Sequence, residues 1–127
     1  MTGPGSGGTQ PQDEIHRLIY SAVAQRRPIG AIYKERKRLL CPHRLGRNSE
    51  DLHRVLCYQH GGESESGLGP PGDPGNWRCL ALEKLGQVEL LEGPWHTAEN
   101  HTRPAHCIVR VEIDVDDQPD REPQNGQ

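Results

Sequence analysis

The sequence predicts a mainly β domain that begins with a single helix. An apolar stripe with helical spacing runs from Ile15 to Val23, and after Pro28 it gives way to short apolar runs that end at turn residues. A last run, Cys107–Val115, alternates apolar and polar residues as a half-buried strand does. Successive short strands of this kind are typical of a small barrel or a sandwich.

The helix is defined along its length and at both ends. Its apolar side chains recur every three or four residues, at Ile15, Leu18, Ile19, Ala22 and Val23. Thr9 and Gln12 have the spacing of a capping box at its start. Arg26 and Arg27 complement the negative end of the helix, and Pro28 prevents its continuation. A single stripe predicts that one side of the helix packs against the rest of the domain.

Five apolar runs after Pro28 are predicted to form a meander of strands. Charged or Gly-containing turns separate them, as at Glu35–Lys37 and Gly46–Asn48. Residues 63–76 contain three Pro and four Gly, so they are predicted to form a loop. The five predicted strands are Ile29–Lys34, Arg38–Leu45, Leu52–Gln59, Trp77–Leu82 and Gln87–Leu91.

The chain of 127 residues suits one domain with a tail at each end. Residues 1–8 and 118–127 carry almost no apolar side chains and are predicted to be disordered. Residues 9–95 hold the helix and the five-strand unit, and residues 96–117 hold a polar linker and the extra strand. Only 31% of the residues are hydrophobic, so the core is small and a dimer would add to its burial.

Neither a membrane span nor a secretion signal is expected. No apolar run reaches the roughly 20 residues that a spanning helix needs, and the N-terminus is rich in Gly, Pro and Gln. We therefore expect a cytoplasmic protein. Its cysteines are far apart in the sequence and are expected to be reduced core residues: Cys41, Cys57, Cys79 and Cys107.

The positive charge is concentrated in one segment. Residues 26–47 hold eight Lys or Arg and one acid, whereas residues 48–127 hold six and fifteen. A basic segment is most often a solvated face. Here, however, the cations lie on predicted strands that also carry Tyr33, Tyr58 and Trp77. Guanidinium groups beside aromatic rings suit phosphates and stacked bases, so this segment predicts an anion-binding surface.

Metal binding and catalysis are not expected. The closest approaches to metal-ligand spacing, Cys57-x-x-His60 and the segment His101–Cys107, are irregular, and no cofactor site is predicted. Cys41 and His43 would share one face of a strand, but no third residue is placed to orient the histidine. We therefore predict no catalytic residue and a protein that is not an enzyme.

The order of these features resembles that of a WYL domain, a bacterial regulatory module. The resemblance runs from Gln12 to Trp95 and includes RRPIGAIYKERKRLLCPHRLGRN and WRCLALEKLGQVELLEGPW. In the family a strand ending in Tyr is followed by a charged turn, then Arg, an apolar stretch, Pro and Leu. The matching residues here are Tyr33, Arg38, Leu39-Leu40, Pro42 and Leu45. DLHRVLCYQ occupies the strand that names the family, with His53-Arg54-Val55 in place of Trp-Tyr-Leu.

The resemblance implies a small Sm-like, SH3-type barrel of about five antiparallel strands, capped by the helix. It also implies a sensor of nucleic acid or a nucleotide-like ligand, often in a transcription regulator. Only one helix precedes the predicted barrel, so no helix-turn-helix is expected in this chain. A stand-alone sensor or a partner of a separate DNA-binding chain is expected instead.

These observations lead to one hypothesis and one alternative. The leading hypothesis is a non-enzymatic regulatory module that binds an anion, either single-stranded nucleic acid or a nucleotide, on a basic face of the barrel. The residues expected to bind it are Tyr33, Arg38, His43, Arg44, Arg54, Arg78 and Lys84. The alternative is a protein–protein interaction scaffold, either a homodimer or the partner of a DNA-binding chain, that binds no ligand.

Overall fold

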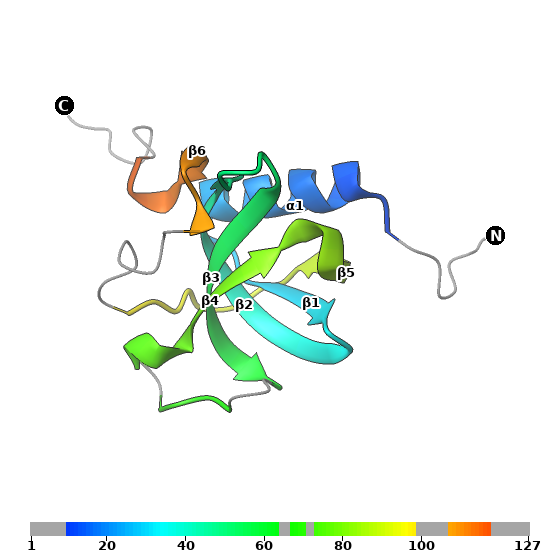
Figure 1. Cartoon of the computed structure of the whole chain (residues 1–127). Coiled ribbons are helices and arrows are strands. Elements are labelled where there is room, and N and C mark those ends of the chain that lie inside the picture. The colour runs from blue at the N-terminus through cyan, green and yellow to red at the C-terminus, as the bar shows by residue number, and fades with distance from the viewer. Residues whose placement is uncertain (1–9, 64–66, 71–72, 99–106, 118–127) are drawn as a thin grey trace.

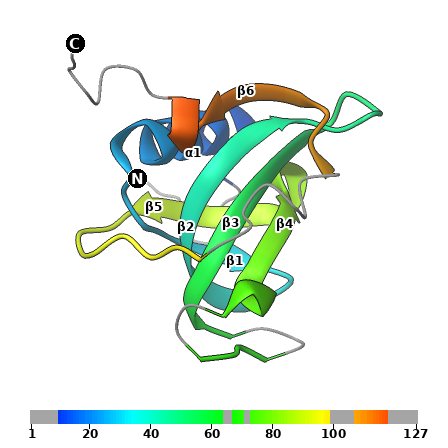
Figure 2. The same ribbon diagram turned by 90° about the vertical axis from the view of Figure 1, so that its left-hand side faces the viewer.

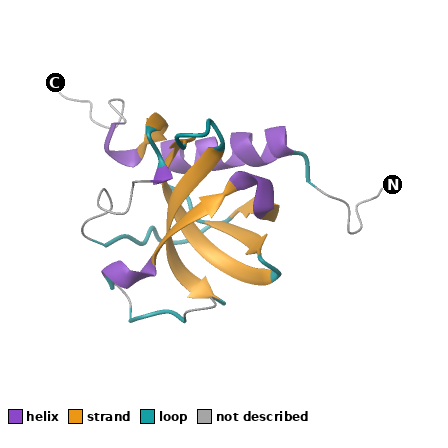
Figure 3. Cartoon of the chain, in the orientation of Figure 1, coloured by secondary structure: helices purple, strands orange, loops and turns teal. Residues whose placement is uncertain are grey.

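A computed structural model describes residues 10–63, 67–70, 73–98 and 107–117. They form one helix and a six-stranded antiparallel sheet (Figures 1 and 3), so the predicted mainly β class with an N-terminal helix is confirmed. The tails predicted at 1–8 and 118–127 lie outside the described residues. The elements are α1 (Gln12–Gln25), β1 (Ile29–Tyr33), β2 (Arg36–Arg47), β3 (His53–Gly62), β4 (Trp77–Ala81), β5 (Leu85–Leu90) and β6 (Arg110–Asp114).

The strands follow the order β4-β3-β2-β1-β5, and β6 pairs with the far end of β2. The sheet is strongly curved. In Figure 2, β6 runs across the top of the molecule, next to α1. Within the described residues no pairing joins β4 to β5, so the sheet is open. A closed Sm-like barrel therefore stays a prediction.

The hairpin between β1 and β2 turns on two residues with positive φ. Lys34 and Glu35 have φ of 52° and 65°, and Tyr33 pairs with Arg36 across the turn. Two successive residues in this region make the tight turn whose twist matches that of antiparallel strands. The predicted turn at Glu35–Lys37 therefore begins one residue earlier, and β2 begins at Arg36.

The helix packs its apolar stripe onto the sheet as predicted. Ile15, Ile19, Ala22 and Val23 are fully or almost fully buried and α1 contacts β2, β5 and β6. The start of the helix differs from the capping box, because Pro11 occupies the N-cap position and no side chain caps the helix there. Thr9 lies outside the described residues.

A second apolar cluster covers the opposite face of β2, β3 and β4. It is built from Cys41, Leu56, Tyr58, Trp77 and Ile108, with Trp95 packed against them. A disulfide between Cys79 on β4 and Cys107, whose Cα atoms are 6.6 Å apart, ties the segment before β6 to this face. The expectation of four reduced cysteines is therefore wrong for this pair, because the fold brings together two residues that are distant in the sequence.

The last strand shows only part of the predicted alternation, in which every second side chain from Cys107 to Val115 would be buried. Ile113 is 8% exposed, but Val109 and Val111 are 58% and 47% exposed, so the prediction that they face the core is wrong. The pairing of β6 with β2 shifts register between Leu45 and Gly46, and this bulge interrupts the alternation. Gly46 is required at the bulge, because a Cβ there would collide with the carbonyl oxygen of Arg110.

In the part of the chain that the structure describes, no helix combines the length and the apolar character that a membrane crossing requires.

Candidate functional site

Two of the seven predicted binding residues, Tyr33 and Arg38, form one group inside the curve of the sheet. The guanidinium group of Arg38 lies 5.2 Å from the ring centroid of Tyr33 and donates two hydrogen bonds to the Tyr33 carbonyl oxygen. It also donates to Oε1 of Gln59 on β3. Arg38 is only 4% exposed. This group therefore links β1, β2 and β3 from within.

Two further predicted residues, Arg44 and Arg54, are each paired with a carboxylate. Nε of Arg44 donates to Asp114 on β6, and both side chains are largely buried. Nη1 of Arg54 lies 3.1 Å from Oε1 of Glu83 and also donates to the carbonyl oxygen of His53. These carboxylates neutralise much of the positive potential that the two arginines would offer to an anion.

Arg78 holds the loop that connects β3 to β4. Its guanidinium group donates to the carbonyl oxygens of Gly67 at 3.1 Å and Gly75 at 2.7 Å. Arg78 is half-buried. Because its guanidinium group bonds two carbonyl oxygens of the loop, the position of this positive charge depends on the conformation of the loop.

Lys84 ends the short 3-10 helix between β4 and β5. It is exposed and lines a hollow of about 240 Å³ together with Lys34. Glu35 and Glu83 line the same hollow, so it carries charges of both signs. Apart from Tyr33 and Arg38, the predicted residues described so far have different partners, and the role of all seven in binding stays a prediction.

His43 is a buried member of the second apolar cluster. Its ring centroid lies 4.8 Å from that of Trp77 and 4.7 Å from that of Trp95. Nδ1 is 2.7 Å from the carbonyl oxygen of Cys41, and Nε2 is 2.9 Å from Oγ1 of Thr97. A carbonyl oxygen only accepts, so Nδ1 of His43 donates its proton to Cys41. These two hydrogen bonds and the two indole rings fix the orientation of the His43 ring.

Next to this cluster is a small hollow of about 150 Å³, which we call the loop hollow. It is lined by Tyr58, His60, Leu68, Gly69, Asn76, His96 and Thr97. The rings of His60 and His96 are stacked, with centroids 4.2 Å apart and planes 12° from parallel. Burial, and then the proximity of His96, lowers the pKa of His60 to about 4. The pair therefore presents a neutral His60 at physiological pH.

Hydrogen bonds fix the polar wall of the loop hollow. The Tyr58 hydroxyl donates to the carbonyl oxygen of Asp73 at 3.1 Å. The Asn76 side chain bridges the loop, accepting from the Gly69 amide at 2.8 Å and donating to the Gly69 carbonyl oxygen at 3.2 Å. Nε2 of His60 is buried and has no hydrogen-bond partner among the described residues. The wall of the hollow thus contains two stacked flat rings, and one of them carries a buried nitrogen without a partner among the described residues.

The two thiols are poorly suited to nucleophilic catalysis. Burial raises the pKa of Cys41 to about 11, although its Sγ accepts a hydrogen bond from the backbone N–H of His96. Burial, with a smaller contribution from Cys41, also raises the pKa of Cys57 well above its ordinary value. Both thiols are therefore protonated at neutral pH, and the ring of His43 bonds to other partners than the Cys41 thiol.

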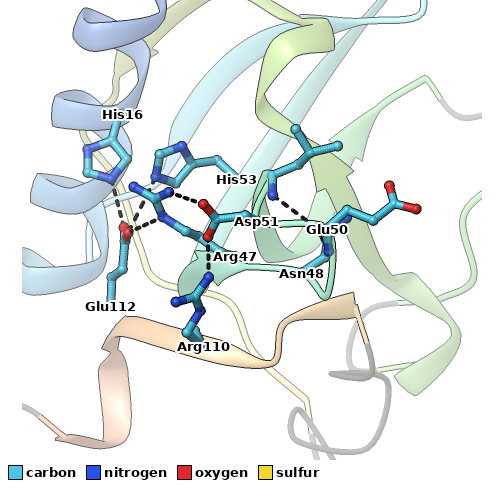
Figure 4. Close-up of polar contacts among 9 residues, drawn as sticks. His16, Arg47, Asn48, Glu50, Asp51, His53, Arg110 and Glu112 are labelled. Carbon is cyan, nitrogen blue, oxygen red and sulfur yellow. Dashed lines mark hydrogen bonds and ion pairs between the residues drawn. The ribbon is translucent and has the colours of Figure 1, made fainter.

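A larger hollow of about 460 Å³ lies between α1, β3 and β6, and we call it the helix hollow. Figure 4 shows His16, His53 and Arg47 arranged around Glu112. Nε2 of His16 is 2.8 Å from Oε1 of Glu112, and Nε2 of His53 is 3.3 Å from Oε2. Nε of Arg47 donates to Oε2 at 3.2 Å. One carboxylate on β6 thus joins two imidazoles and a guanidinium group from three other elements.

Sequence reasoning missed this second hollow. His16 and Glu112 are 96 residues apart, and His53 and Glu112 are 59 apart, so no local spacing reveals them. His53 stood out only because it replaces the Trp of the naming motif. Of the two sequence segments closest to metal-ligand spacing, His101–Cys107 lies mostly outside the described residues. In the other, Cys57-x-x-His60, Cys57 is a fully buried core residue.

In comparisons with known proteins, no family model, no curated protein and no solved structure matches the chain.

Proposed function

We propose that the protein is a non-enzymatic binding module of the WYL type whose ligand is nucleotide-like. Its planar base enters the loop hollow, and its phosphate stays outside. The observation that carries this proposal is the stacked pair of His60 and His96 at a hollow of about 150 Å³. A space of about that size admits one six-membered aromatic ring. We therefore expect a pyrimidine base rather than a larger purine.

The lining of the loop hollow supports a base in particular. Flat side chains stack on every base, and Asn76 and Thr97 offer hydrogen-bonding groups nearby. Leaving Nε2 of His60 buried without a partner costs about 1–3 kcal/mol. A ring with a polar edge that reaches this nitrogen recovers part of that cost, whereas a purely apolar ring does not.

The charge distribution favours a short anionic ligand over a long strand. Arg78 bonds the loop whose residues Gly69 and Asn76 line the hollow, so a guanidinium group lies beside it. Arg44 and Arg54 are paired with Asp114 and Glu83 and add little to a continuous basic track. We therefore expect a salt dependence of about one phosphate contact, a log–log slope of roughly −0.7.

The state of the thiols supports a role without catalysis. Cys41 has its pKa raised to about 11 by burial, and His43 is held by the Cys41 carbonyl oxygen and Thr97. A protonated thiol with no base aimed at it is a poor nucleophile.

Tryptophan fluorescence tests the proposal, because Trp77 and Trp95 pack beside the wall of the hollow. The full chain is titrated with uridine and adenosine monophosphates, a cyclic nucleotide and a short oligothymidine, each at two salt concentrations. We expect saturable quenching by the pyrimidine ligands and an affinity at least tenfold weaker in His96→Ala. His16→Ala, which removes an imidazole from the separate helix hollow, serves as the matched control and should bind normally. No saturable change with any ligand would refute the proposal.

An interaction scaffold is the second candidate, and the exposed edge of β6 favours it. Val109 and Val111 are large, exposed and close together, and in the described residues β6 pairs with β2 alone. An edge strand with apolar side chains is suited to pairing with another strand. Light scattering of the wild type and of Val111→Lys decides this: a dimer that the substitution dissociates supports the scaffold, and a monomer in both excludes the homodimer.

The Sm-like barrel and the cytoplasmic location belong to the same proposal. The Cys79–Cys107 disulfide argues against the cytoplasmic location, since such bonds are rare in reducing compartments. Mass spectrometry after alkylation of intact cells would decide, because a cytoplasmic protein would carry the label on both cysteines.

A further inference from the structure

The helix hollow brings together three side chains of the types that bind transition metals. His16 comes from α1, His53 from the first residue of β3 and Glu112 from β6. Their ligand atoms, two imidazole nitrogens and a carboxylate oxygen, all lie within 4.8 Å of one another. Figure 4 shows the two rings directed at the same carboxylate. We propose that this cluster is a binding site for a divalent transition metal ion, with zinc as the best fit.

The donor set is the first argument. Two neutral imidazoles and one carboxylate are a common set of three protein ligands for zinc and for other divalent first-row metals. Zinc bonds of about 2.0–2.1 Å place tetrahedral ligands ~3.3 Å apart. His16 and His53 already lie 2.8 Å and 3.3 Å from the oxygens of Glu112. Since no two of the three ligand atoms are more than 4.8 Å apart, they lie within about 1.5 Å of this separation.

The surroundings of Glu112 are the second argument. Arg47 donates to Oε2 of Glu112 and, through Nη1, to Oδ2 of Asp51 at 3.1 Å. Metal-binding carboxylates are commonly held in this way by an outer hydrogen bond, which leaves the other oxygen, here Oε1, for the ion. Asp51 is also paired with Arg110. The positive charge of Arg47 is thus shared between two carboxylates.

The shape of the hollow is the third argument. At about 460 Å³ it has room for an ion, its bound water and a small anion. Asp13 lines it one helical turn before His16, and its carboxylate adds negative potential on the side of α1. Three protein ligands with an open fourth position are typical of sites where the metal also binds water or an exchangeable ligand. This role is independent of the loop hollow and of the ligand proposed for it.

A metal at this position would tie the helix to the sheet. His16, His53 and Glu112 belong to elements that meet only through tertiary packing. An ion that binds the folded state alone stabilises it in proportion to the logarithm of its concentration over the dissociation constant. We therefore expect the melting temperature to rise on metal addition and to return after chelation.

The test is a cobalt and zinc titration of the full chain, prepared without an affinity tag and first treated with a chelator. Cobalt bound by nitrogen and oxygen ligands in a tetrahedral site gives visible absorption bands, and zinc should displace it. We expect one equivalent per chain. His16→Gln, His53→Gln and Glu112→Gln should each weaken binding at least a hundredfold. Arg47→Ala should weaken it about tenfold, as loss of an outer hydrogen bond does.

A matched control separates this site from the other histidines. His96→Gln removes an imidazole from the loop hollow and should leave cobalt affinity and stoichiometry unchanged. Melting in the presence of chelator shows whether each variant is folded, and if one is not, the remaining two carry the test, since each removes one ligand by itself. Unchanged affinity in the folded variants, or equal loss in His96→Gln, would overturn the proposal. Nucleotide binding is measured in the presence of chelator, where no metal is bound. A failure of nucleotide binding therefore tests the loop hollow alone and is distinguishable from a failure of the metal site.

Discussion

Asp114 on β6 accepts a hydrogen bond from Nε of Arg44 on β2, although 70 residues separate the two in the sequence. The side chain of Asp114 is 3% exposed and that of Arg44 is 16% exposed. Oδ1 of Asp114 also accepts the backbone N–H of Asp116. This buried ion pair fastens the last strand to the sheet and thereby positions Glu112, two residues earlier, beneath α1.

Removing the carboxylate at Asp114 should strongly destabilise the fold. Asp114→Ala leaves the Arg44 guanidinium buried without its partner, which costs about 3–5 kcal/mol. Urea unfolding followed by circular dichroism measures the change. Glu83→Ala is the matched control, because Glu83 pairs with Arg54 but is 42% exposed, and its loss should cost less than about 1 kcal/mol. Equal effects of the two substitutions would contradict this assignment.

Stability should fall on mild acidification because of His60. Burial, followed by the influence of His96, lowers the pKa of His60 to about 4 in the folded state, from an ordinary value of 6.5. Between these values the unfolded chain binds a proton that the folded chain excludes, so the free energy of unfolding decreases as the pH falls from about 6.5 to 4. His60→Gln should show a shallower decrease over this window. Parallel curves for wild type and variant would contradict the prediction.

The thiols of Cys41 and Cys57 should react slowly in the native protein. Burial raises the pKa of Cys41 to about 11 and that of Cys57 well above its ordinary value, so little thiolate forms at pH 8. Alkylation with iodoacetamide, counted by intact mass, should be slow without denaturant and complete in its presence. Rapid native labelling of either residue would instead indicate an accessible thiolate.

Reduction of the disulfide should lower stability without abolishing the fold. Cys79 and Cys107 are separated by 28 residues, and closing a loop of that length stabilises a protein by about 3.6 kcal/mol in the chain-entropy account. Unfolding curves of Cys79→Ser/Cys107→Ser, compared with the wild type, measure the loss. The sheet order should persist, since the β2–β3 and β1–β2 pairings do not depend on Cys107. A change below about 0.5 kcal/mol would contradict the stabilising role.

Local patterns were enough to predict the elements of this fold. The stripe from Ile15 to Val23 predicted the buried side of α1, and the apolar runs predicted every strand to within a few residues. Local patterns misplace the ends, as at Lys34 and Glu35, where two non-glycine residues adopt positive φ. They also misjudge β6, because the bulge opposite Gly46 depends on where another strand crosses.

Tertiary pairings are what the sequence pattern leaves undetermined. A cluster of arginines in one segment predicted a basic face, yet each strand alternates its side chains between two faces and carboxylates from distant segments pair with Arg44 and Arg54. The same folding creates the helix hollow from His16, His53 and Glu112, and the disulfide from Cys79 and Cys107. Such contacts over long separations leave no periodic signal in a single sequence.

The most direct test of the central claim is the NMR response of the His60 and His96 imidazole rings to uridine monophosphate. If the base enters the loop hollow, the carbon-bound ring protons of both residues shift upfield in a saturable manner, and those of His16 and His53 stay unchanged. If the ligand binds while the His60 and His96 signals stay in place, or if no ring signal responds at millimolar nucleotide, the claim is contradicted.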